Sequence, residues 1–412
     1  MHTKPLDGRY IILLSVLIYL LIVYIGSLFI GYYEFSKYLG VTTHTQRSFA
    51  DIYYLLKVAE CNHQGYNVYQ PTACADGIFL VYPKIWLGIY YTGLKADNAL
   101  IIGLVLISIL FISLFKLIGK ISLKEGLYYS LFLSAPPIVY CIEYGNPDII
   151  IFILCVISVL LFRNKISRKL LSLPLMFAAF LKLFPFITIA SLLDNNKSKS
   201  IKIFLSLLSI SLLYITINWN HILFFSHIGY NYYFLGSWEG CFGARAVFDY
   251  FDQYEPIHNN IFSLLPSTFF AYGTTILILV MSWIFARRFK FNLPESDFLF
   301  SFKLGALLYI GIFLLGKQYD YKLILLLLVI PQLFQWIKDP RIKALAFSAL
   351  VGIIISLWSH RAFDLFNSVG LRYKYFLMTM TEETINWLLL GFFTFMLLNS
   401  LPIWAKKWLA LP

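Results

Sequence analysis

Hydrophobic runs of about the length of a membrane-spanning helix recur along almost the whole chain. A helix of about 20 predominantly apolar residues is long enough to cross a bilayer. The runs cover Ile11–Ile30, Ala99–Leu117, Leu127–Ile142, Ile149–Phe162, Ile201–Trp219, Phe262–Phe285, Phe298–Leu315, Leu323–Ile337, Ala344–Trp358 and Ile385–Leu401. This pattern predicts an all-α polytopic membrane protein, with residues 1–412 forming a single transmembrane domain.

One further hydrophobic stretch, 170–193, does not fit a simple crossing. It has basic residues on both sides, and Lys182 and Pro185 lie near its middle. Proline removes a helical hydrogen bond and favours a break, and a single crossing would place the following lysines on the opposite side from the other basic loops. We therefore expect a re-entrant hairpin of two short helices, and about 10–12 transmembrane helices in total.

Composition supports the membrane assignment and excludes several other classes. Hydrophobic residues make up 59% of the chain and charged residues only 13%, against roughly 25% charged in soluble domains. This excludes a soluble enzyme, a nucleic-acid-binding domain and a disordered chain. The net charge of +12 comes from Lys and Arg clusters between the hydrophobic runs. That distribution follows the positive-inside rule, so the lipid bilayer rather than nucleic acid is the expected partner, and both termini are expected in the cytoplasm.

The resulting topology places the longest polar segments on the outer side of the membrane. These are the first extracytoplasmic loop, 32–98, a second large loop, 220–260, and the shorter loops 317–322 and 359–374. A transporter usually carries its ionisable residues within the membrane, between broken helices. Polar residues gathered in outer loops instead favour chemistry at the outer membrane interface.

The first outer loop carries a candidate acid–base residue, Asp51. Phe49, Ile52 and Leu56 have helical spacing, which predicts an amphipathic helix lying in the interface, with Asp51 at the edge of its apolar face beside Tyr54. An alternative is that Ser48 and Asp51 form a capping box, in which Asp51 only satisfies backbone amides.

Two other features organise the same loop. The stretch 82–92, rich in Trp and Tyr, predicts a second interfacial helix. Cys61 and Cys74 bracket a short segment on the expected oxidising side, which predicts a disulfide; the alternative is two unpaired thiols. No zinc-ligand spacing and no nucleotide-binding glycine motif occurs in the sequence, so we expect neither a metal nor a cofactor.

The turn from Glu143 to Asp148 allows two interpretations. Asn146 as N-cap, Pro147 in the first helical position and Asp148 in the first turn make a well-formed helix start. Alternatively, Glu143 or Asn146 faces a polar cavity.

Several short motifs follow one another along the chain: Asp51 in an early loop, Gly65-Tyr-Asn-Val-Tyr69, Tyr82-Pro83, Gly145-Asn146-x-Asp148, Lys182-x-x-Pro185 and Asn259-Asn260-Ile-Phe-Ser263. Taken in this order, they resemble the polyprenyl-phosphate-sugar-dependent glycosyltransferases of the GT-C fold. The closest resemblance is to glycosyltransferase family 87, which includes mannosyltransferases of glycolipid synthesis. Where that family often has Gly-Gln, this chain has Gly145-Asn146, and where it often has a late His, this chain has Tyr321.

The resemblance implies a GT-C-like bundle with juxtamembrane helices in the first outer loop, in a bacterial cytoplasmic membrane. It implies a hexosyltransferase that takes a sugar from a polyprenyl phosphate, passes it to a lipid or glycan acceptor, and uses Asp51 as the general base. One carboxylate and no nucleophile would give a single displacement with inversion. Cations would stabilise the departing phosphate; the candidates are Lys322, Lys317, Arg245, His258, Arg361, Arg372 and Lys182. Residues expected to line the substrate cavity are Tyr54, Glu143, Asn146, Asp148, Asn260, Asp320 and Tyr321.

Two alternatives from other classes remain open. The helix number and the broken 170–193 segment also suit a transporter or lipid flippase, although no internal repeat is evident. A polysaccharide polymerase would also be polytopic with cationic outer loops, and it would need no base in the first loop. Substitution of Asp51 separates the three, because only the glycosyltransferase depends on it.

Overall fold

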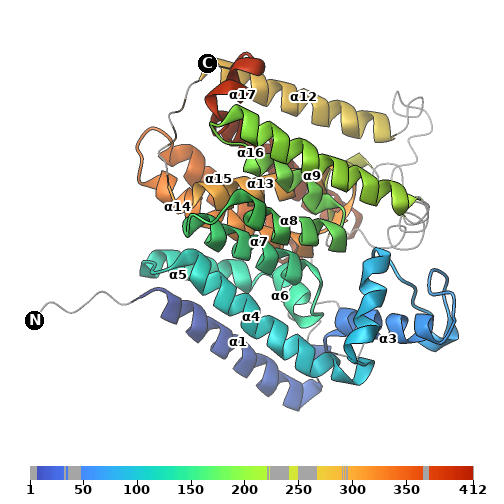
Figure 1. Ribbon diagram of the computed structural model, residues 1–412. Coiled ribbons are helices and arrows are strands. Elements are labelled where there is room, and N and C mark those ends of the chain that lie inside the picture. The colour runs from blue at the N-terminus through green and yellow to red at the C-terminus, as the bar shows by residue number, and fades with distance from the viewer. Residues whose placement is uncertain are drawn as a thin grey trace, which may run out of the picture. The chain divides into compact units, whose positions relative to one another are not determined.

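The computed structural model is predominantly helical (Figure 1). It describes residues 7–31, 34–35, 48–219, 222, 241–248, 267–289, 291, 293, 296–364 and 371–411. The chain divides into two compact units, Met1–Leu160 and Leu161–Pro412.

The first unit contains two long apolar helices joined by the first loop and followed by shorter helices. Its elements are α1 (Arg9–Ile30), α3 (Ala50–His63), the 3-10 helices η1 (Ala73–Ala75), η2 (Lys84–Thr92) and η3 (Ala96–Asn98), then α4 (Ala99–Ile118), α5 (Leu123–Leu133), α6 (Pro136–Glu143) and α7 (Asp148–Arg163). A helix is present within the stretch 82–92 as η2, in 3-10 rather than α form; its position at the membrane interface stays a prediction.

The hydrophobic run Leu127–Ile142 was expected to be one span, and the structure corrects this. Helix α5 ends at Leu133 and α6 begins at Pro136. Proline lacks a backbone N–H and is favoured in the first turn of a helix, so it starts a new helix rather than continuing the old one. The break makes α6 short, and α6 forms with α7 a pair bent by 95°.

The second unit is a bundle of helices with one small β-ribbon. Its elements are α8 (Arg168–Leu181), η4 (Phe184–Leu192), α9 (Lys197–Ile217), β1 (Cys241–Phe242), α12 (Ser267–Arg288), α13 (Leu299–Leu314), β2 (Gln318–Tyr319), η6 (Asp320–Leu328), α14 (Ile330–Ile337), α15 (Lys343–Asp364), α16 (Leu371–Asn399) and α17 (Ile403–Trp408).

The stretch 170–193 is broken near its middle, where Lys182 and Pro185 lie. Helix α8 ends at Leu181, Lys182 is extended, and η4 begins at Phe184 with Pro185 in its first turn. The Arg168 guanidinium lies 2.7 Å from the Asp194 carboxylate and ties the start of α8 to the segment after η4. A re-entrant path through the membrane stays a prediction.

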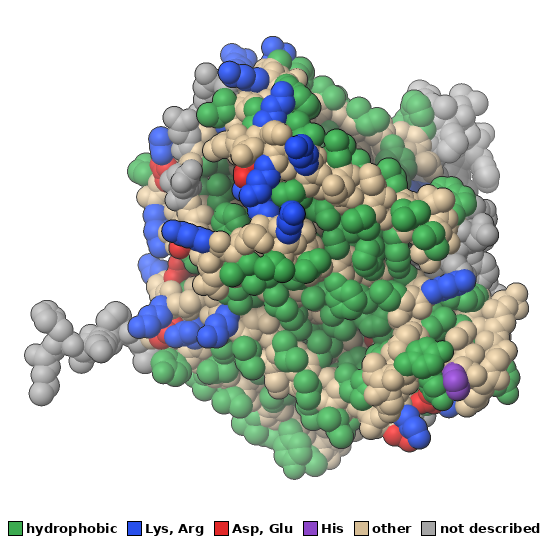
Figure 2. Space-filling model, in the orientation of Figure 1, with side chains coloured by type: hydrophobic (Ala, Val, Ile, Leu, Met, Phe, Trp, Pro, Cys, Tyr) green, Lys and Arg blue, Asp and Glu red, His purple; other side chains and the backbone are tan. Residues whose placement is uncertain are grey.

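The part of the chain that the structure describes has four helices long and apolar enough to cross a membrane: Arg9–Ile30, Ala96–Ile118, Lys197–Ile217 and Thr268–Arg288. The number rises to six if each of two bent pairs forms one span. Hydrophobic side chains cover much of the surface over α1 and α4 (Figure 2). These findings agree with an all-α, multi-pass membrane protein, while the expected number of about 10–12 helices stays a prediction.

Helices α1 and α5 pack against each other (Figure 1), and Gly8 and Gly126 meet backbone to backbone where they do. A β-carbon at Gly126 would overlap the backbone of Gly8. We therefore expect Gly126→Ala to destabilise the protein by on the order of 1 kcal/mol, because backbone cannot move aside as a flexible side chain can. Thermal unfolding in detergent measures the change. Gly273→Ala is the matched control, since a β-carbon there meets nothing within 4 Å, and equal melting temperatures for the two variants would contradict the prediction.

Candidate functional site

Asp51 lies in the first turn of α3, which is docked on the turn between α6 and α7. The N-cap residue Phe49 is left-handed, with φ 56° and ψ 41°. Its backbone N–H donates to the Glu143 carbonyl at 2.8 Å, and the Asp51 N–H donates to the Tyr144 carbonyl at 3.1 Å. The Phe49 ring occupies the space that Gly103 leaves open on α4. Backbone contacts therefore fix where the Asp51 carboxylate is held.

Asn146 orients this carboxylate from the facing turn. Its Nδ2 donates to Asp51 Oδ2 at 2.6 Å, and its Oδ1 accepts from the Asp148 backbone N–H at 2.9 Å. Asn146 is only 1% exposed. The two hydrogen bonds together determine that its NH₂ group, and not its carbonyl oxygen, faces Asp51. The helix-start interpretation of this turn is confirmed by the bond to the Asp148 N–H, and the same side chain also contacts Asp51. A polar cavity facing Glu143 or Asn146 stays a prediction.

The capping-box alternative for Asp51 is wrong. Phe49, not Ser48, is the N-cap of α3, and no side chain caps this helix. The Ser48-x-x-Asp51 spacing fails because the chain enters α3 through the left-handed Phe49, which shifts the helix start by one residue.

The close neighbours of Asp51 explain its accessibility. Asp51 is partly exposed, whereas Asp148, whose backbone N–H also contacts Asn146, is fully buried at the start of α7. Gly145, with φ 63°, allows Ile52 of α3 to pack against the turn. Tyr54 is partly buried on α3, and Glu143 is partly exposed at the end of α6. The group therefore presents the Asp51 carboxylate, oriented by Asn146 and partly exposed, on a buried support.

The predicted Cys61–Cys74 disulfide is present and links the last turn of α3 to η1. The Val68 carbonyl accepts from the Leu80 N–H at 2.8 Å, which closes the intervening loop, and Val68 itself is buried. The crosslink and this bond hold the loop against α3, the helix that carries Asp51.

The second unit brings together several of the predicted cations and polar residues around the β-ribbon. Cys241 pairs with Tyr319, and Phe242 with Gln318. A β-carbon at Gly243, where φ is 122°, would overlap the Gly316 carbonyl, so only glycine permits the close approach. The ribbon holds the segment that carries Arg245 against the segment that carries Lys317 and Asp320, which are 6% and 1% exposed.

The remaining candidates of this unit take different positions. Lys322 contacts Gln318 and lies over the Phe184 ring at 5.6 Å, and Tyr321 stacks on Tyr319 at 5.3 Å. Lys182 is buried at the break after α8. His258 and Asn260 lie outside the described residues, and so do the side chains of Arg361 in α15 and Arg372 in α16.

Sequence reasoning missed a buried polar network on α16. Glu382, Glu383 and Asn386 are at most 1% exposed. Glu383 accepts from the Gly243 N–H at 3.4 Å and from Asn386 Nδ2 at 3.3 Å. The Asn386 Oδ1 accepts from the hydroxyls of Ser356 at 2.8 Å and Tyr309 at 3.2 Å.

Sequence reasoning missed this network because it placed the start of α16 too late in the chain. The hydrophobic run placed the helix at Ile385–Leu401, whereas α16 begins at Leu371. The two adjacent glutamates therefore fall before the expected span, in a region where charged residues are ordinary. Among the described residues, no group of three or more His, Cys, Asp and Glu is arranged to hold a metal ion.

Comparisons with known proteins give no relative for this chain. No family model matches it, and neither a curated protein nor a solved structure is significantly similar.

Proposed function

We propose that the protein is an integral-membrane glycosyltransferase that moves a sugar from a polyprenyl phosphate to a hydroxyl of a lipid or glycan acceptor. The observation that supports this most is the Asp51–Asn146 contact at 2.6 Å. It orients a partly exposed carboxylate in the loop that precedes the candidate span Ala96–Ile118. Asp51 would then lie at the membrane interface, where the sugar of a lipid-linked donor can reach it.

The chemistry requires one proton acceptor near the attacking hydroxyl. An ionised carboxylate can only accept hydrogen bonds and protons. One oxygen of Asp51 can therefore take the proton of the attacking hydroxyl, while Asn146 donates a hydrogen bond to the other oxygen. The acceptor oxygen forms a bond to the anomeric carbon as the carbon–oxygen bond to the phosphate breaks. The polyprenyl phosphate leaves with the electron pair, and the single displacement inverts the anomeric centre. Binding of the phosphate by Lys317, Arg245 or Lys322 stays a separate prediction.

The direct test is sugar transfer by the purified, reconstituted protein. Radiolabelled polyprenyl-phosphate hexoses and pentoses are presented one at a time, with a lipid extract and a glycan fraction as acceptors. We expect label from one donor to enter an acceptor, and protein-free vesicles to give none. Failure of every donor, combined with protein-dependent movement of a labelled lipid between leaflets, would overturn the proposal.

A transporter or flippase is the second candidate, and the buried α16 network favours it. Ionisable side chains inside membrane segments often mark a substrate or proton path. Glu382, Glu383 and Asp320 are all buried in the second unit, and η6 and α14 form a pair bent by 55°. Broken helices of this kind line the binding sites of secondary transporters. For this candidate, Glu383→Gln should abolish lipid movement while Asp51→Asn leaves it unchanged.

A further inference from the structure

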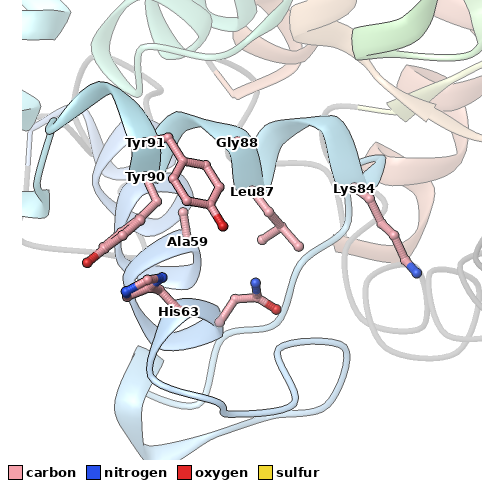
Figure 3. Close-up of a pocket in the computed structure, with 8 residues that line it drawn as sticks. Ala59, His63, Lys84, Leu87, Gly88, Tyr90 and Tyr91 are labelled. Carbon is pink, nitrogen blue, oxygen red and sulfur yellow. The ribbon is translucent and has the colours of Figure 1, made fainter.

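A groove in the first unit lies between α3 and η2, apart from Asp51. It encloses about 470 Å³ and is lined by Ala59, Asn62, His63, Lys84, Leu87, Gly88, Tyr90 and Tyr91. Figure 3 shows His63 and Tyr90 at one end and Lys84 at the other, with Leu87 and Gly88 between them. The His63 and Tyr90 rings stack 3.9 Å apart. The groove therefore has an aromatic end and a cationic end.

The polar groups of the groove are available for a ligand. In the described part of the chain, neither the Asn62 amide nor the Lys84 ammonium has a hydrogen-bond or ion-pair partner. The nearby Glu60 is engaged elsewhere, because it accepts from the Ala96 N–H at 2.8 Å and lies 3.9 Å from the Lys57 ammonium. No carboxylate lines the groove, so its charge suits an anion.

The aromatic neighbour of Lys84 leaves this positive charge in place. The Lys84 ammonium lies 6.0 Å from the centre of the Tyr69 ring. The Tyr69 phenol is neutral at physiological pH, as an unperturbed phenol is, and burial raises its pKa further, to about 12; it therefore does not compensate the cation.

The position of the groove indicates where its ligand comes from. Only Gly93, Leu94 and Lys95 separate the end of η2 from the candidate span Ala96–Ile118. Large hydrophobic side chains on and beside η2 are exposed, with Tyr91 at 82% and Ile85 at 39%. Aromatic and aliphatic side chains beside a span mark the headgroup level of a bilayer. The groove therefore lies beside a candidate span, at the level that lipid headgroups would occupy when this span crosses a bilayer.

We propose that this groove binds the headgroup of an anionic phospholipid. The phosphate lies at Lys84 and Asn62, where an ammonium and an amide N–H donate to its oxygens. The hydroxyl-bearing part of the headgroup lies against Tyr91 and the His63–Tyr90 stack. The site is independent of the proposed sugar transfer, and it gives the first loop a lipid anchor of its own.

Native mass spectrometry of the full-length protein in detergent tests this inference. Short-chain phosphatidylglycerol and phosphatidylserine are titrated beside phosphatidylcholine and inorganic phosphate, and the bound fraction gives an apparent Kd. We expect at least one anionic lipid to bind about tenfold more tightly than phosphatidylcholine or free phosphate. Lys84→Gln should weaken that binding by about tenfold, as expected for loss of a charge-assisted hydrogen bond.

The matched control is Lys95→Gln, which removes the same charge from an exposed position outside the groove. We expect it to change the Kd by no more than about twofold, through loss of long-range attraction alone. Tyr91→Ala should weaken lipid binding without lowering the melting temperature, because Tyr91 is so exposed. Equal effects of the two lysine variants, equal binding of phosphatidylcholine, or binding of inorganic phosphate as tight as that of the lipid would each overturn the inference.

Discussion

Asp51→Asn is expected to lower the rate of sugar transfer by on the order of 10²- to 10⁴-fold, the range typical of a lost general base. The substitution keeps the shape of the side chain, and an amide at this position can still pair with Asn146. It removes the capacity to accept the acceptor's proton. The donor dissociation constant should change little, because the proposed step acts on the attacking hydroxyl and not on the donor phosphate.

Two further variants serve as controls for this measurement. Asp76→Asn makes the same change at an exposed residue of the same loop, and Asn tolerates the left-handed backbone there; its rate should equal that of the wild type. Asp51→Glu keeps a carboxylate but shifts it by one methylene, and it should fall between the other two. Full transfer activity of Asp51→Asn, in protein of normal melting temperature, would remove Asp51 as the base.

Substitutions of Asn146 should separate its two roles. Asn146→Ser keeps an oxygen that can accept from the Asp148 N–H, so the start of α7 stays capped. Its shorter side chain no longer reaches Asp51, so the hydrogen bond that Asn146 Nδ2 donates to Asp51 is lost. A hydrogen bond to a charged group contributes about 1.5–3 kcal/mol. If that contribution is expressed in the transition state, kcat/KM falls by between about 10- and 100-fold, with stability close to that of the wild type.

Asn146→Ala removes both bonds and completes the comparison. Its transfer rate should match that of Asn146→Ser, while its free energy of unfolding should fall by a further ~1 kcal/mol from the lost cap. Kinetics and thermal unfolding are measured on the same preparations. If Asn146→Ser transfers sugar at the wild-type rate, Asn146 is only a helix cap and does not position the base.

The parts of the fold predicted correctly depend on local sequence signals. The apolar run that became α1, the Asn146-Pro147-Asp148 start of α7 and the Cys61–Cys74 pair each lie within a short stretch of sequence. Helix starts and apolar spans follow from neighbouring residues, so they can be recognised without knowledge of the fold.

The parts that local signals do not predict depend on contacts between distant residues. Asp51 and Asn146 are 95 positions apart; the family resemblance puts both in one expected site, but no periodicity predicts that they meet. Glu383 is bonded to Gly243 across 140 positions, through a ribbon that needs glycine at 243. From sequence alone, two adjacent glutamates are expected to be solvent-exposed, because burying a charged group is costly. Their burial is tolerated only when hydrogen-bond partners compensate the cost, and those partners come together only in the folded chain.

The disulfide of the first loop offers a way to find out on which side of the membrane that loop lies. The structure describes three free cysteines, Cys141, Cys155 and Cys241, and all three are buried. In sealed vesicles of known orientation, a reductant and a maleimide that cannot cross the bilayer will tag Cys61 and Cys74 only when the loop faces the bulk solution. The native crosslink is therefore a built-in reporter of sidedness, and no engineered cysteine is required.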